Sequence, residues 1–292
     1  MSKIQEFEEY IESRGLAEST INAYVRAIKD FKMYVHKPLH KATTEDVDTW
    51  VRSMQGKGLK HRTINLKING VKRFYRFLKR RGQSTQEIEG ILETELLRIP
   101  DIQREVITED EILVALDNME DDRNKAILAI LFRTGLRARE VINLRKRNFT
   151  EKEDYVAINV VNTKGGKNRQ VFMDYFYYEF VKEYMYSHHN AGGWVIISSE
   201  KWTGYDKADD LSLSYDRFRR LVKSFSKEYL GRELTPHDFR ASCFTHLYRQ
   251  GVDIYTIAKL AGHSSIETTK KYIYADEHDI VGKSIDAFKG GK

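Results

Sequence analysis

Cysteine, proline and long apolar segments are scarce in this chain of 292 residues. The single cysteine, Cys243, excludes an intrachain disulfide and any zinc site or redox motif built from paired cysteines. No apolar run is long enough to span a bilayer, and the start, MSKIQEFEEY, lacks the apolar core of a secretory signal. Hydrophobic residues make up 41% of the chain and charged residues 32%, which is typical of a folded soluble protein. We therefore expect a cytoplasmic protein without membrane segments.

Motifs for common cofactors are also missing. The chain has no GxxxxGK[ST] segment, so the sequence implies no bound ATP. The five histidines His188, His189, His237, His246 and His263 form no HxxxH pair with one another and join no carboxylate cluster with the spacing of metal ligands. We expect a protein that works without a metal ion or an organic cofactor.

Acidic residues are absent from residues 57–81, KGLKHRTINLKINGVKRFYRFLKRR. Apolar residues recur there at helical spacing, among them Ile64, Ile68 and Val71, so the segment is predicted to be an amphipathic helix whose polar face has one sign of charge. Such a face attracts phosphates, although many basic helix faces are simply solvated. We favour contact with double-stranded DNA. The candidate DNA-binding residues are Lys57, Lys60, Arg62, Lys67, Lys72, Arg73, Arg76 and Lys79.

The sign of the charge reverses after this helix. From residue 83 to residue 122, acidic residues far outnumber basic ones. A change this abrupt marks a candidate domain boundary. We predict an N-terminal DNA-binding helical bundle at 1–82, a partly helical linker at 83–106 and a second domain at 107–292.

Periodicity assigns the chain to the mainly α class. Helices are predicted at 3–13, 18–35 and 45–54 in the first domain, and at 124–132, 176–188 and 214–229 in the second. Residues 155–161 and 169–173 read as strands, and the turn-rich TKGGKN between them predicts a β-hairpin. The second domain is therefore expected to be α+β, with a small antiparallel sheet.

Six side chains of the second domain form a set suited to opening a phosphodiester bond without a metal ion. Arginines oppose the charge of an anionic transition state, lysine and histidine move protons, and a tyrosine hydroxyl attacks phosphorus. The candidates are Arg137, Lys164, His237, Arg240, His263 and Tyr272.

Local sequence places several of these residues at helix starts, where free backbone amides attract anions. Arg137 follows Gly135 in TGLRARE, and Glu140 can hold its guanidinium from three residues away. In TPHDFR the proline suits a first helical position, so His237 and Arg240 share the opening turn. Taken alone, Arg137 and Glu140 would be interpreted as an ordinary surface pair, and the alternative for the second motif is a capping His237 with a surface Arg240.

Two positions stay open on the residues alone. Either Lys164 or Lys167 in NTKGGKNR could reach a phosphate, because the glycines between them allow close approach of the backbone. Tyr272 and Tyr274 both follow the final histidine motif, and tyrosine is abundant, with 17 in the chain.

In this order the motifs resemble the tyrosine recombinase (phage integrase) family and, within it, the Xer group. TGLRARE resembles the family's first arginine box, NTKGGKNR its β-hairpin lysine motif, and TPHDFRASCFTHLYRQG with LAGHSSIETTKKY its second box. The first 82 residues resemble its helical core-binding domain. The segment RASCFTHLY departs from the more familiar RHSFATHLL, but not at a catalytic position.

The resemblance implies a role for each candidate. Tyr272, rather than Tyr274, is the nucleophile that forms a 3′-phosphotyrosyl bond, and Lys164, rather than Lys167, protonates the leaving 5′-oxygen. The other implied roles are stabilisation of the non-bridging oxygens by Arg137, Arg240 and His263, proton transfer by His237, and support of the first arginine by Glu140.

It also implies partners and a biological role. The expected partner is double-stranded DNA, held by four copies of the chain, and the expected role is Xer-type resolution of chromosome dimers at a dif-like site. The alternatives are an integrase or excisionase of a mobile element, a topoisomerase-like enzyme that nicks and reseals, and a DNA-binding regulator without catalysis. After the tyrosines, Ile280, Val281, Ile285 and Phe288 predict a terminal helix that packs on its own domain or docks on a neighbouring copy.

Overall fold

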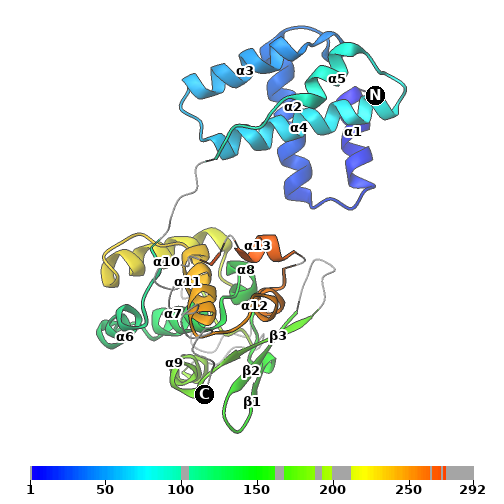
Figure 1. Cartoon of the computed structure of the whole chain (residues 1–292). Coiled ribbons are helices and arrows are strands. Elements are labelled where there is room, and N and C mark those ends of the chain that lie inside the picture. Colours follow the sequence, from blue (N-terminus) through cyan, green and yellow to red (C-terminus); the bar gives the residue numbers. More distant parts are fainter. Residues whose placement is uncertain are drawn as a thin grey trace, which may run out of the picture. The chain divides into compact units, whose positions relative to one another are not determined.

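The structure, a computed structural model, describes residues 2–99, 105–161, 168–187, 193–198, 212–263, 265–270 and 272–273. The chain divides into two compact units between residues 102 and 103, and each is described by itself (Figure 1). A helical first unit and a second unit with a small antiparallel sheet confirm the predicted fold class. Within the described ranges, every helix is too short or too polar to cross a membrane.

The first unit is a bundle of helices, and α1, α3 and α5 begin at capping side chains. Ser2 and Thr43 each form a reciprocal capping box with the residue three positions later. The basic helix begins only at His61, because Gly58 takes a positive φ of 74° and interrupts the chain before it. The helices are α1 (Lys3–Glu12), α2 (Glu18–Val35), α3 (Thr44–Gly56), α4 (His61–Arg80) and α5 (Gln86–Glu93), with a 3-10 turn η1 (Leu39–Lys41).

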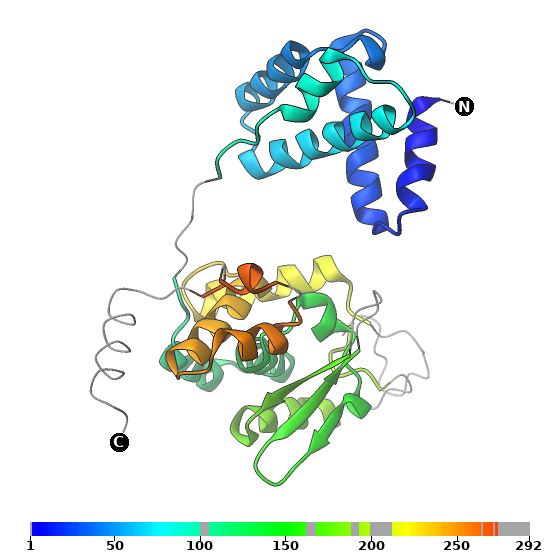
Figure 2. The same ribbon diagram turned by 45° about the vertical axis from the view of Figure 1, so that its right-hand side comes forward.

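Aromatic rings fill the core of this unit, where α4 crosses α2 at a steep angle (Figure 2). Phe7 meets Phe74 edge to face with ring centroids 5.4 Å apart, and Phe31 lies 5.0 Å from Trp50. The buried hydroxyl of Tyr75 donates to the carbonyl of Leu39 at 2.7 Å, so its polar atom is satisfied inside the core. Burial raises the pKa of this phenol, which therefore stays protonated.

Residues 83–99, which we expected to belong to the linker, run along the first unit. Helix α5 buries Ile88 and Ile91 in its core. Beyond α5, the side-chain amide of Asn65 pairs with both backbone groups of Leu97 at 2.8 Å, and His61 Nδ1 lies 2.8 Å from the carbonyl of Arg98. These bonds imitate a strand pairing, and they hold the segment against α4 as far as residue 98.

The second unit surrounds one long hydrophobic helix, α7. Its strand order is β1-β2-β3, and both pairings are antiparallel, with Ile158 opposite Val171 in the hairpin. The strand β1 was not predicted from the sequence. The elements are α6 (Glu109–Asn118), α7 (Asp122–Thr134), α8 (Ala138–Ile142), η2 (Lys146–Asn148), β1 (Phe149–Glu151), β2 (Val156–Val160), β3 (Arg169–Met173), α9 (Tyr175–Tyr186), α10 (Tyr215–Tyr229), α11 (Pro236–Arg249), α12 (Ile254–Ala261) and α13 (Ile266–Lys270).

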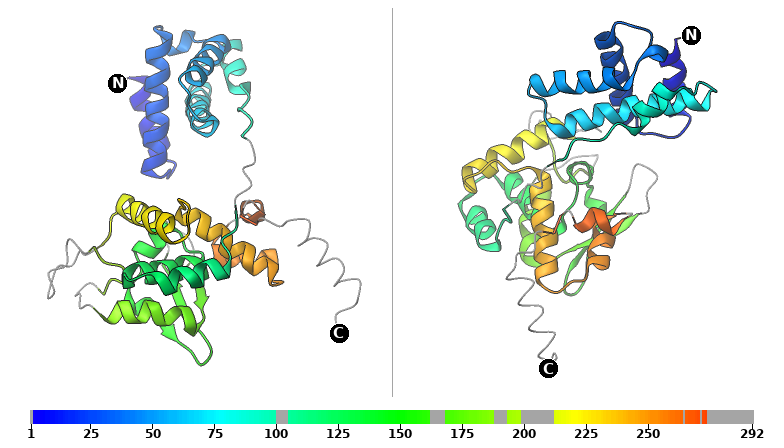
Figure 3. Two further views of the ribbon diagram at one scale, coloured as in Figure 1. Left: turned by 90° about the vertical axis from the view of Figure 1, so that its left-hand side faces the viewer. Right: turned by 45° about the horizontal axis from the view of Figure 1, so that its top comes forward.

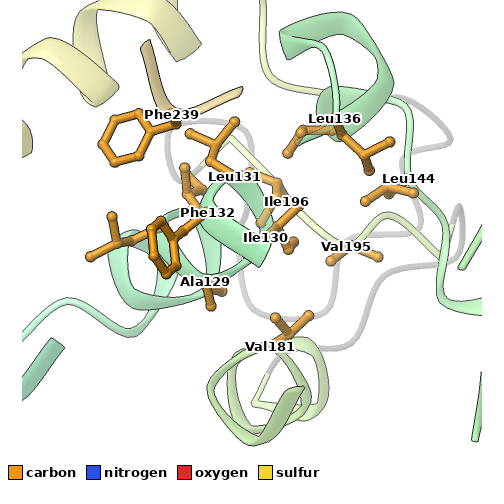
Figure 4. Packing of buried hydrophobic residues seen from close by; sticks show 14 of the residues in the cluster. Ala129, Ile130, Leu131, Phe132, Leu136, Leu144, Val181, Val195, Ile196 and Phe239 are labelled. Carbon is orange, nitrogen blue, oxygen red and sulfur yellow. The ribbon is translucent and has the colours of Figure 1, made fainter. Parts of the chain in front are cut away.

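The core of this unit lies between α7, the sheet and α9. Residues 126–132 of α7 are buried on every side, as expected of a helix that is apolar all round. Figure 4 shows Ile130, Leu131 and Val195 at its centre, with Val181 of α9 below them. Figure 3 shows the second unit from two directions, with the yellow helix α10 leading into the gold helix α11. Residues 194–198 form isolated bridges, from Trp194 to Arg145 and from Ile197 to Ser212.

Gly135 ends α7 and begins the turn that leads to α8. Its φ is +58°, in the left-handed region that favours glycine. A Cβ added there would lie 2.8 Å from Phe244 Cε1 and 3.2 Å from Cys243 Sγ, both on α11. The turn therefore requires glycine for its backbone and also for the close approach of α11.

We expect Gly135→Ala to destabilise the second unit by about 2–4 kcal/mol, because left-handed strain and overpacking add together. Gly251→Ala is the matched control, since Gly251 has a φ of +88° and nothing within 4 Å of the added Cβ, so strain alone costs about 1 kcal/mol. Calorimetric unfolding of both variants measures the difference. Equal losses would show that packing against α11 contributes nothing.

Candidate active site and candidate DNA-binding face

Arg137 stands at the entrance to α8, as its N-cap rather than in its first turn. Its backbone amide donates to Glu140 Oε2 at 2.7 Å, and its Nη1 donates to Glu140 Oε1 at 3.1 Å. The predicted support of Arg137 by Glu140 is therefore present in the geometry. The Arg137 side chain remains 38% exposed, so part of the guanidinium faces solvent, where an anion can reach it.

Glu140 serves a second arginine, which the sequence analysis did not select. Arg169, the first residue of β3, donates from Nη1 and Nη2 to the two oxygens of Glu140, both at 2.9 Å. Burial alone would raise the pKa of Glu140, but the bonds from Arg169 and from the Arg137 amide outweigh it and hold that pKa below its ordinary value. Strand alternation carried the signal for Arg169, because it shares the inward face with Val171 and Met173.

Arg240 lies at the centre of the cluster and is 1% exposed. Its Nη1 donates to the carbonyl of Gly135, and its Nη2 donates to the carbonyl of Ala261 at 2.7 Å and to His263 Nε2 at 3.0 Å. Burial, and then the charge of Arg137, lower the pKa of Arg240 to about 10, so the guanidinium remains charged at neutral pH. Its Nε is buried and has no hydrogen-bond partner among the described residues.

His263 is held as a neutral ring. Since Arg240 can only donate, His263 Nε2 accepts, and the ring proton is assigned to Nδ1, 2.9 Å from Thr269 Oγ1. Burial, and then the neighbouring arginines, lower the pKa of His263 to about 4. The ring therefore carries no charge at neutral pH in this state.

Tyr272 covers the cluster. Its ring stacks on His263 with centroids 5.3 Å apart and lies 5.6 Å from the Arg240 guanidinium. Phe244 lies 4.6 Å from the same guanidinium and meets the Tyr272 ring edge to face at 6.1 Å. The exposed His237 lies 6.4 Å from Tyr272, ring to ring. Helix α13 ends at Lys270, and the Tyr272 amide donates to the carbonyl of Thr269 at 2.9 Å, which places the tyrosine just beyond the helix.

The structure thus brings five of the six candidates together. Arg137, His237, Arg240, His263 and Tyr272 come from α8, α11, the joint between α12 and α13, and the turn after α13. The predicted hairpin lysine, Lys164, and its alternative, Lys167, lie outside the described residues, as do Tyr274 and the predicted terminal helix. Because Arg240 is inaccessible here, a phosphate must displace a covering group before it contacts that guanidinium.

The first unit presents a stripe of arginines along α4. Residues three and four positions apart lie on the same side of a helix. The stripe contains Arg62, Leu66, Asn69, Arg73, Arg76 and Arg80, all exposed or half-buried. Arg73 is half-buried, and its Nε is buried without a hydrogen-bond partner in the described part of the chain.

Three of the predicted DNA-binding lysines have partners within the first unit instead. Lys67 pairs with Asp30 on α2, Lys79 with Glu89 at 2.7 Å, and Lys72 donates to the carbonyl of Thr94 at 2.8 Å. Burial lowers the pKa of Lys72. A run of basic letters does not show which side chains face neighbouring elements, so these contacts became visible only in the structure. Lys57 and Lys60 precede α4 and are exposed.

Comparison with known proteins matches both units. A model of the phage integrase family matches residues 105–278, and a model of the phage integrase N-terminal SAM-like domain matches residues 4–82. Tyrosine recombinase XerA of Pyrococcus furiosus is 26% identical over 275 residues, which cover 92% of this chain and 88% of that protein.

Solved structures share the fold. XerH site-specific recombinase bound to its difH substrate in a pre-cleavage complex is 20% identical, with a TM-score of 0.68, over 93% of this chain and 80% of that one. A lambda integrase tetramer bound to a Holliday junction is 17% identical, with a TM-score of 0.71, over 93% and 76%. Because the family model for the second unit alone matches more than half of the chain, this protein belongs to the phage integrase family, the tyrosine recombinases, which cleave and rejoin DNA strands.

Proposed function

We propose that this protein is a site-specific DNA recombinase that works through a 3′-phosphotyrosyl intermediate formed on Tyr272. The observation that carries the proposal is the convergence of Tyr272, His263, Arg240 and Arg137 from segments distant in the sequence. A phenol nucleophile that stacks on His263 and lies over the buried Arg240 has beside it the groups that can stabilise the charge of the transition state.

In the proposed cleavage step, the Tyr272 oxygen attacks phosphorus, and the bond to the 5′-oxygen of the next nucleotide breaks. His237, exposed beside the Tyr272 ring, takes the phenol proton. Lys164 protonates the leaving 5′-oxygen, a role that rests on the resemblance of its motif. The phosphotyrosine conserves the energy of the broken bond, and reversal of the step onto a new 5′-hydroxyl rejoins the strands.

Charge stabilisation falls to the arginines. Arg137 offers its exposed edge to a non-bridging oxygen, and Arg240 Nε is a buried donor without a partner among the described residues, which a phosphate oxygen would satisfy. His263 is neutral here because burial and the arginines disfavour its charge. An arriving phosphate offsets the positive charge around it, which favours the protonated ring that can donate to the second non-bridging oxygen.

The finer role that we propose is Xer-type resolution of chromosome dimers at a dif-like site. It is supported by the similarity to XerA over most of both chains. Integration or excision of a mobile element uses the same chemistry, as does nicking and resealing by a topoisomerase-like enzyme.

Covalent capture of the protein on fragmented DNA of its host, followed by sequencing, distinguishes these roles. One chromosomal site near the replication terminus supports the Xer-type role, whereas sites at the ends of a mobile element exclude it. Strand exchange between two labelled duplexes separates recombination from simple resealing. A protein that binds duplexes but forms no adduct would be a regulator without catalysis.

The first functional prediction concerns the nucleophile. Tyr272→Phe removes only the hydroxyl, so it should abolish the covalent adduct on nicked suicide duplexes that carry candidate sites, with duplex affinity unchanged. Tyr274→Phe is the matched control and should still form the adduct. Denaturing gel electrophoresis of the mixtures measures both outcomes. If Tyr274 proves essential and Tyr272 dispensable, the assigned nucleophile is wrong.

The second functional prediction concerns the arginine stripe. Changing Arg62 and Arg76 together to glutamine should weaken duplex binding and lower the slope of log affinity against log salt by about one unit for each phosphate that the protein no longer binds. The control exchanges Lys72 and Lys79 for glutamine, because both have partners within the unit. Fluorescence anisotropy across a salt series measures the slopes. A larger change in slope for the lysine pair would reverse the assignment of the two faces.

The third functional prediction concerns assembly, which we propose to depend on the terminal residues of a neighbouring copy. A cavity of about 310 Å³ opens between β3, α7 and α11. Apolar residues such as Phe132, Phe172 and Leu247 line it together with charged residues that include Arg133 and Asp174. This cavity suits the apolar residues Ile280, Val281, Ile285 and Phe288 of a second chain.

Truncation after Asp276 should preserve binding to a single site while impairing synapsis of two sites. Leu247→Glu should cause the same loss from the receiving side, because it places a charge among the apolar residues of the cavity. Gel-shift assays with one and two sites measure both effects. Full recombination by the truncated chain would rule out this assembly.

A further inference from the structure

Arg169 is a buried arginine whose donors all point inward, and the cleavage chemistry described above assigns it no role. It opens β3, and its side chain is 9% exposed. Nη1 and Nη2 reach the two oxygens of Glu140, and Nε donates to the carbonyl of Leu260 at 2.7 Å. With each of its three nitrogens engaged, Arg169 is unsuited to binding phosphate itself.

On one side, Arg169 limits the hydrogen bonds that Glu140 can form with the side chain of Arg137. The carboxylate gives its paired, fork-to-fork geometry to Arg169 and only a single side-chain bond to Arg137. Without Arg169, both oxygens of Glu140 would be available to Arg137. That guanidinium would then be drawn into the carboxylate, and less of its charge and fewer of its donors would face a phosphate.

On the other side, Arg169 supports the joint that carries His263. The carbonyl it holds belongs to Leu260 in the last turn of α12, and Gly262 follows with a φ of +64°. A Cβ on Gly262 would lie 3.2–3.3 Å from three atoms of the Arg169 side chain, so the joint packs directly on the arginine. The next residue is His263, whose ring is bonded to Arg240.

We propose that Arg169 is a positioning residue for strand cleavage, which aligns Arg137 and His263 on the same phosphate by tying Glu140 to the end of α12. This inference rests on the proposed recombinase function. It leads to a specific prediction, because Arg137 and His263 act on the charged non-bridging oxygens. Loss of Arg169 must therefore harm stabilisation of that charge more than it harms folding or DNA binding.

The test is single-turnover cleavage of the suicide duplex on which the unchanged full-length chain forms its adduct. A second duplex carries a neutral methylphosphonate at the scissile position, so its transition state has one negative charge fewer. Arg169→Met should lose about 10²-fold in rate on the phosphodiester, the scale of a small misalignment of catalytic groups. The loss on the methylphosphonate should be at least about tenfold smaller, as expected when the variant is deficient in stabilisation of charge. Arg169→Lys should recover little, because an ammonium cannot reproduce the fork.

Arg232→Met is the matched control, since Arg232 is a partly buried arginine that forks onto Glu111 (2.5 and 3.2 Å) away from the cluster. It should cleave both duplexes at the unchanged rate. A second variant, Gly262→Ala, disturbs Arg169 without removing charge and should show the same preference for the methylphosphonate. Its control is Gly231→Ala, which has a similar φ of +69° but nothing within 4 Å.

Equal losses on the two duplexes for Arg169→Met and Gly262→Ala would mean that Arg169 is only structural, and unchanged rates would mean that it is dispensable. Either result overturns the inference while leaving the proposed function intact. If Arg169→Met does not fold, the comparison of Gly262→Ala with its control still tests the inference. Failure of the unchanged chain to form any adduct would overturn the proposed function, and the inference with it.

Discussion

The buried guanidinium of Arg240 is the group on which the second unit depends. It donates to the carbonyls of Gly135 and Ala261, which lie at the C-terminal ends of α7 and α12. Helix C-termini carry partial negative charge, so two of them compensate for a cation removed from water. The same guanidinium contacts His263 and lies under Tyr272. The hydrogen bonds that join α7 and α12 to Arg240 therefore also define the site. A change in how these helices pack would change the geometry of the site.

The sequence predicts what is local in this fold. Side chains that cap helices, such as Thr43, Thr108 and Thr235, mark starts that the structure reproduces. The sequence did not predict features that depend on distant partners. The acidic composition after residue 82 favours a linker, yet Ile88 and Leu97 are held by α3 and α4 through contacts that no local pattern encodes. Strand β1 has three residues, too few for an alternation to be recognised.

The candidate site divides in the same way. Residue types and spacing selected Arg137, Arg240 and His263 before any geometry was known, because each stands in a motif that starts or ends a helix. The sequence did not predict the charge of His263 or the accessibility of Arg240. A histidine kept neutral by arginines, and an arginine closed over by a tyrosine, are properties of packing. Arg169 was missed for a related reason, since its partners lie on α8 and α12.

The bonds from α4 to residues 97 and 98 shorten the stretch of chain between the last contact within the first unit and the first contact within the second. On the far side of the junction, Ile107 is held to α11 by Ser242 and by His246, at 3.0 and 2.7 Å. Arg98 and Ile107 are only nine positions apart in the chain, so the tether spans at most about 32 Å. A free chain from residue 82 to residue 107 would reach at most about 90 Å. A shorter tether raises the effective concentration of one unit near DNA held by the other. The bonds of Ile107 to Ser242 and His246 attach the end of this tether to α11, the helix that carries His237 and Arg240.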